Sequence, residues 1–135
     1  LNVRIRKNTE TPLFQPEIEA GERFSIEFQL PPSSEHKDMI AFMINPLYLI
    51  EFLIPNAWDL STNIRERIEL TAPAYWIKGK RHILGMFSPK NLVLPLLRYL
   101  TQMNIPENHI NFLDEFISLA SNSDTLVFKG VLLLS

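Results

Sequence analysis

The chain has no cysteine, only four glycines and no long uninterrupted hydrophobic run. Without cysteine, the protein cannot form disulfides, thiolate zinc sites, iron–sulfur clusters or a cysteine nucleophile. The four glycines form no phosphate-binding loop, and no serine stands in a Gly-x-Ser-x-Gly motif. The most apolar stretch, Met39–Asn56, is interrupted by Glu51 and two prolines. Its apolar pieces are far shorter than the roughly 20 residues that a bilayer requires, so no membrane span is predicted.

What is present is typical of one folded domain covering residues 1–135. Hydrophobic residues make up 46% of the sequence and charged residues 21%, which is too apolar for disorder. The net charge of −2 gives no global attraction to nucleic acid or anionic lipid. Because the sequence opens on Leu1 rather than Met, we expect a processed product or an excised domain. The compartment stays open between the cytoplasm and export after loss of a targeting segment.

Alternating apolar and polar residues predict strands over about residues 2–87. The clearest pattern is Arg23–Leu30, in which every second residue is apolar. Shorter strands are predicted at Asn2–Lys7 and Arg65–Ala72, and a helix starting at Ser61 or Thr62 is the alternative for the latter.

The stretch Met39–Asn56 predicts a buried β-hairpin. Its two apolar runs, Met39–Ile44 and Leu49–Ile54, have strand length and are separated by turn-forming residues that begin with Asn45-Pro46. Both faces of the first run are apolar, so this strand should be covered on both sides. A helix over Leu47–Ile54, capped by Asn45, is the alternative.

Helical spacing of apolar residues predicts a helix pair over about residues 91–121, followed by a closing strand over about residues 125–134. In the second helix, the apolar stripe is centred on Ile110, Leu113, Ile117 and Ala120, and Phe112, Phe116 and Leu119 widen it. We therefore predict a β-rich fold, an antiparallel β-sandwich with an α-helical hairpin inserted before the last strand. The helices should cover the two-faced strand, and any apolar surface left over would be available to a partner.

Four short segments carry a family resemblance: Ala20-Gly21-Glu22-Arg23-Phe24, Leu53-Ile54-Pro55-Asn56, Arg67–Pro73 and Gly79–Ser88. In this order they resemble the bacterial immunoglobulin-like β-sandwich domain of unknown function that is found attached to caspase-like peptidases, protein kinases and envelope lipoproteins. The resemblance covers about residues 1–88 and departs from the family at Asn45–Tyr48, where an Asp/Gly-rich turn is expected. It implies an accessory or interaction module without catalytic residues.

The residue types that usually carry catalysis form no recognisable site. His36, His82 and His109 lack metal-ligand spacing, and we expect all three to be exposed to solvent. Glu66 and Glu69 would point to opposite faces of a strand, which does not suit paired acid–base work. We therefore expect no enzyme activity, no metal and no cofactor.

The segment from Tyr75 to His82 combines aromatic and basic side chains, which can bind phosphate backbones or stack on bases or sugars. The candidate binding residues are Tyr75, Trp76, Lys78, Lys80, Arg81 and His82. The alternative is a plain hairpin turn around Gly79 with Trp76 filling the edge of the sandwich. The predicted function is protein–protein interaction, with another protein or an adjacent domain of the same polypeptide as partner. Nucleic-acid or glycan binding through this hairpin is the alternative, and exposed edge strands leave a homodimer open.

Overall fold

The computed structural model of the chain describes residues 3–7, 16–29, 37–55 and 64–135. Its strands are β1 (Arg4–Arg6), β2 (Glu17–Ile18), β3 (Arg23–Glu27), β4 (Lys37–Ile44), β5 (Ile50–Ile54), β6 (Arg67–Thr71), β7 (Gly79–Pro89) and β8 (Leu126–Leu134). Its helices are α1 (Lys90–Leu97), the short 3₁₀ helix η1 (Arg98–Thr101) and α2 (Glu107–Ala120). The predicted strands at the start of the chain, in the hairpin, at residues 65–72 and at the end are confirmed. Both helical alternatives are wrong.

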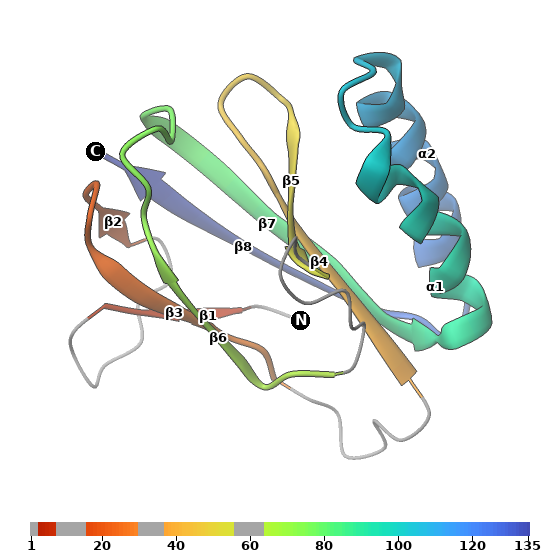
Figure 1. Cartoon of the computed structure of the whole chain (residues 1–135). Coiled ribbons are helices and arrows are strands. Elements are labelled where there is room, and N and C mark those ends of the chain that lie inside the picture. Colours follow the sequence, from red (N-terminus) through yellow and green to blue (C-terminus); the bar gives the residue numbers. More distant parts are fainter. Residues whose placement is uncertain (1–2, 8–15, 30–36, 56–63) are drawn as a thin grey trace.

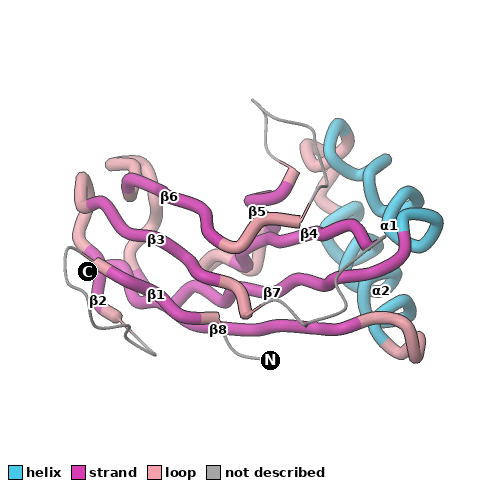
Figure 2. Tube along the Cα trace, turned by 90° about the horizontal axis from the view of Figure 1, so that it is seen from below, coloured by secondary structure: helices cyan, strands magenta, loops and turns pink. Residues whose placement is uncertain are grey.

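The elements form three layers, shown in Figure 1. A three-stranded sheet, in the order β1-β3-β6, packs against a five-stranded sheet in the order β2-β8-β7-β4-β5. The helices cover the other face of the five-stranded sheet, and Figure 2 shows them beside the end of β7 that leads into α1. This confirms the predicted β-sandwich with helices before the last strand. The pairing is antiparallel except between β2 and β8, which run parallel, and β2 was not predicted.

Strand β4 lies between two hydrophobic cores, as its two apolar faces predict. Met39, Ala41 and Met43 point into the core between the two sheets. Ile40 and Phe42 point the other way, into the core beneath the helices. All five side chains are almost completely buried. The helices therefore cover an apolar face that the sandwich alone would leave exposed to water.

Helix α2 faces the sheet with one edge of the predicted stripe. Ile110 and Ile117 are 66% and 65% exposed, so the predicted centre of the stripe is wrong. The buried residues are His109 and two of the residues expected to widen the stripe, Phe112 and Phe116, each one position before a residue of the predicted centre. One position corresponds to a rotation of about 100° around the helix axis. The aromatic rings explain this rotation, because those of Phe112 and Phe116 pack edge-on against Phe42, with centroids 4.9 and 5.0 Å away.

His109 is buried in this interface, so its predicted exposure to solvent is wrong. Its Nδ1 accepts a hydrogen bond of 2.9 Å from the backbone N–H of Ile50, in the edge strand β5. Its Nε2 lies 2.8 Å from the carbonyl oxygen of Met103. Since Nδ1 accepts, Nε2 carries the proton and donates to Met103. The imidazole thus joins the helical layer to the sheet through two backbone groups.

The predicted hairpin turn around Gly79 is also wrong. Residues 75–77 form no strand, and β7 already begins at Gly79. Lys80 and Arg81 pair with Leu133 and Leu132 of β8, so they belong to a long central strand. The sequence suggested a turn because glycine and three basic residues interrupt the apolar pattern. Pairing with β8 overrides that local signal. Across the described segments, no helix is long and apolar enough to cross a membrane.

Candidate functional site

Two connections lie beside each other at one end of the sandwich: the β4–β5 turn, residues 45–49, and the β6–β7 connection, residues 72–78. The register places Ile44 opposite His82, which brings the start of β7 next to the turn. A Cβ atom built on Gly79 would lie only 3.0 Å from Cγ of Pro46. Gly79 also has a φ of 131°, which side-chain-bearing residues rarely adopt. Only glycine therefore fits where the two connections meet.

The side chain of Asn45 fixes the shape of the β4–β5 turn. Its Oδ1 accepts hydrogen bonds from the backbone N–H groups of Leu47 and Leu49, at 2.8 and 3.1 Å. The backbone of Asn45 closes the turn as well, donating to the carbonyl of Leu49 and accepting from the N–H of Tyr48. Asn45 therefore stabilises the turn by hydrogen bonding to the local backbone, which is the reason that asparagine favours turns.

Tyr48 sits at the tip of this turn in a conformation that tyrosine seldom adopts. Its φ is 63°, in the left-handed region that favours glycine, while its side chain is 81% exposed. Such a conformation costs of order 1–3 kcal/mol and persists only where the surrounding structure holds it. The bonds made by Asn45 do so here. The phenol ring is thus presented to solvent on a fixed backbone.

Five large apolar side chains are exposed on the two connections. They are Leu47, Tyr48, Leu49, Tyr75 and Ile77, and we call them the loop-end surface. Tyr75 is the most exposed of them, at 83%. Lys78, Lys80 and His82 are exposed next to the β6–β7 connection. The sequence from Pro73 to His82 contains no carboxylate, so the charge along this side of the loop-end surface is positive.

Two of the six candidate binding residues point inward. Arg81 is completely buried and pairs with Glu51, its Nη1 lying 2.8 Å from Oε2. Its guanidinium also lies 4.4 Å from the centre of the Trp76 ring, a cation–π contact. Trp76 in turn packs against the sandwich core and the ring of Phe24. Trp76 and Arg81 therefore support the connection from beneath, and Tyr75, Lys78, Lys80 and His82 remain on the surface.

The inward-pointing residues Arg81 and Trp76 are linked to the β4–β5 turn. Asn45 donates through Nδ2 to Oε1 of Glu51 at 2.9 Å, while Arg81 bonds the other carboxylate oxygen. A continuous chain of contacts thus runs from the turn through Asn45, Glu51 and Arg81 to Trp76. The sequence does not signal this chain, because Asn45 and Glu51 lie in one predicted hairpin, while Trp76 and Arg81 lie in another.

The described part of the chain contains no group of three or more histidine, aspartate or glutamate residues that could hold a metal ion. His82 is exposed, as predicted. His36, the third histidine, lies outside the described residues.

Comparison with known proteins does not place the chain in a family. No family model matches the sequence, and no curated protein matches it.

Proposed function

We propose that this domain is a non-catalytic interaction module, an accessory domain of the immunoglobulin-like type, which binds a protein partner through the loop-end surface. The observation that carries the proposal is the exposure of Leu47, Tyr48, Leu49, Tyr75 and Ile77 on two adjoining connections. Contiguous apolar surface of this kind marks interaction sites in folded proteins. The order of the strands and the family resemblance of residues 1–88 support the immunoglobulin-like type.

The loop-end surface is held rigidly, which supports a role for it in binding a partner. Asn45 holds the turn through two side-chain hydrogen bonds, and the buried Arg81 supports the neighbouring connection. A preorganised surface loses little conformational entropy when a partner binds. Tyrosine is among the residues that most often dominate binding energy, and both Tyr48 and Tyr75 project from this support.

The charge of the surface indicates the chemistry of the partner. Exposed Lys78, Lys80 and His82 flank the apolar side chains. Complementary charge steers association and disfavours wrong partners. The expected occupant is therefore a protein segment that carries apolar anchor residues next to aspartate or glutamate, either on another protein or on an adjacent domain of the same polypeptide.

The test is selection of binding peptides from a random displayed library on the immobilised domain. We expect the selected peptides to be enriched in apolar residues next to Asp or Glu. The change Tyr48→Ser should weaken their binding roughly 30-fold, as expected for a residue that dominates an interface. Ile117→Ser is the control, because it removes a large apolar side chain that is also mostly exposed, on α2 rather than on the loop-end surface.

Three results would overturn the proposal. The first is a selection without enrichment of such peptides. The second is equal weakening by Tyr48→Ser and Ile117→Ser. The third is tight binding of labelled oligonucleotides or glycans that is lost when Lys78 and Lys80 are changed to Gln, which would favour the alternative ligand class. Self-association of the domain that Tyr48→Ser abolishes would identify a second copy as the occupant instead.

A further inference from the structure

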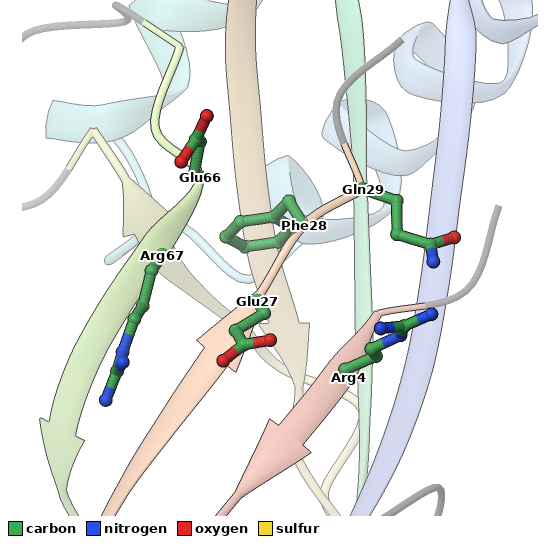
Figure 3. A pocket seen from close by; sticks show the side chains of 6 residues that line it. All are labelled: Arg4, Glu27, Phe28, Gln29, Glu66 and Arg67. Atoms are coloured by element: carbon green, nitrogen blue, oxygen red, sulfur yellow. The ribbon is translucent and has the colours of Figure 1, made fainter. Parts of the chain in front are cut away.

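The outward face of the three-stranded sheet, on the opposite side of the molecule from the helices, carries a regular array of charged side chains. In the strand register, Glu27 lies between Arg4 and Arg67, and Ser25 lies between Arg6 and Glu69. Figure 3 shows Arg4, Glu27 and Arg67 side by side across the three strands. The alternate residues of β3, such as Phe24 and Ile26, point into the core. Ser25 thus occupies the centre of an array of long side chains.

Ser25 is enclosed by this array. Only 3% of it is exposed, and its hydroxyl has no hydrogen-bond partner in the segments that the structure describes. The residue lies in a hollow of about 180 Å³, together with Arg6, Lys7, Arg23, Arg67 and Glu69. Buried hydroxyl groups normally have a partner, so an unpaired one in the lining of a hollow indicates a place for a ligand.

The hollow retains unused donors from two of its cations. Among the described residues, Arg6 pairs with Glu27 and Lys7 pairs with Glu22. Glu69 accepts from both Arg23 and Arg67, at 3.2 and 3.1 Å. Within the described ranges, that shared carboxylate is the only hydrogen-bond partner shown for either guanidinium side chain. A guanidinium carries five N–H groups, so most donors of Arg23 and Arg67 are available.

We propose that this hollow binds a phosphate group carried on a protein segment. The Ser25 hydroxyl and the guanidinium groups of Arg23 and Arg67 supply the donors, and arginine matches phosphate oxygens in geometry and charge. The volume is below the roughly 300 Å³ at which pockets for drug-sized ligands begin, so the hollow accepts a single small group. The site is independent of the loop-end surface, with which it shares no residue.

A second hollow explains why the phosphate is expected on a larger ligand. It measures about 390 Å³ and shares Arg67 with the first. Figure 3 shows the six residues that line it, with Arg4 and Gln29 on one side and Glu66 and Arg67 on the other. A chain leaving the phosphate site past Arg67 enters this space. Free phosphate would leave the second hollow unused.

The test is fluorescence anisotropy with a labelled peptide that carries a central phosphoserine between alanines, at constant ionic strength. We expect saturable binding that inorganic phosphate reverses and that is at least about tenfold weaker for the unphosphorylated peptide, as for loss of charged hydrogen bonds. If inorganic phosphate binds as tightly as the phosphopeptide, the hollow is a phosphate site, but the proposal that a protein segment carries the phosphate is wrong. Absence of saturable binding up to about 10 mM of both probes would overturn the proposal.

Two substitutions should act in opposite directions. Ser25→Ala removes a donor and should weaken phosphopeptide binding at least about tenfold. It should not lower thermal stability, because the hydroxyl has no partner among the described residues that would be lost. Glu69→Gln frees Arg23 and Arg67 from a competing carboxylate and should strengthen binding severalfold.

The matched control is Glu107→Gln, which makes the same charge change at an exposed position of α2. It should leave the affinity unchanged. An equal gain from Glu69→Gln and Glu107→Gln would show that only net charge matters, and full affinity in Ser25→Ala would show that the hydroxyl is not a ligand. Each of these two results would overturn the site.

Discussion

The buried arginine beneath the loop-end surface gives a quantitative prediction. Arg81 is completely buried, while the side chain of its partner Glu51 is 32% exposed. The two members of the pair are therefore not equivalent. Glu51→Gln leaves a positive charge in the interior without a counter-charge, whereas Arg81→Met leaves a carboxylate that still reaches water and the amide of Asn45.

These environments set the expected magnitudes. Removing one partner of a buried ion pair typically costs about 3–5 kcal/mol, and the partial exposure of Glu51 places Glu51→Gln near the lower limit, about 3 kcal/mol. Arg81→Met should cost about 1 kcal/mol, chiefly through the lost contact with Trp76. In the double variant no charge is left unpaired, so the loss should be about 2 kcal/mol, where simple addition would give about 4 kcal/mol.

The measurement is urea unfolding of the parent, both single variants and the double variant, followed by circular dichroism. The double-mutant cycle should give a coupling energy of about 2 kcal/mol between the two positions. If the losses add to within about 0.5 kcal/mol, or if Arg81→Met costs more than Glu51→Gln, the assignment of Arg81 as a charge that depends on Glu51 is refuted.

Two further predictions concern the layers behind this pair. His109→Leu should lower the free energy of unfolding by about 2–3 kcal/mol, because it leaves the buried N–H of Ile50 and the carbonyl of Met103 without a partner; a urea titration that shows less than about 0.5 kcal/mol of change would contradict the role of the imidazole. Gly85→Ala should prevent folding, because a Cβ atom there would overlap the ring of Phe128 and the backbone of Ile40; a soluble variant with an unchanged melting temperature would contradict this close packing of β7.

Much of the fold could be predicted because its strongest signals are local and periodic. The alternation in Arg23–Glu27 predicts a sheet with one polar face, and the two apolar faces of Met39–Ile44 predict a strand covered on both sides. The latter also gives the helices a reason to pack where they do. The missed details depend on contacts between distant segments. The rotation of α2 is set by Phe42 and the backbone of Ile50, which lie far from the helix in the sequence.

The surfaces were less predictable for the same reason. The segment Tyr75–His82 was identified by its composition, but composition cannot show that Arg81 turns inward to a carboxylate 30 residues away. The hollow at Ser25 was not predicted from the sequence. A serine on the polar face of a strand has no distinctive spacing, and its enclosure arises only when the arginines of β1 and β6 come to lie beside it.

The position of β4 between the two cores has a consequence for cooperativity. If the helical layer detached, Ile40 and Phe42 would be exposed on a strand whose other face forms the wall of the sandwich core. If the sandwich opened instead, Met39, Ala41 and Met43 on the other face of this strand would be exposed. Neither layer can therefore open without weakening the other, and local opening of the two should be energetically linked. The helices and the sandwich should therefore unfold as one cooperative unit.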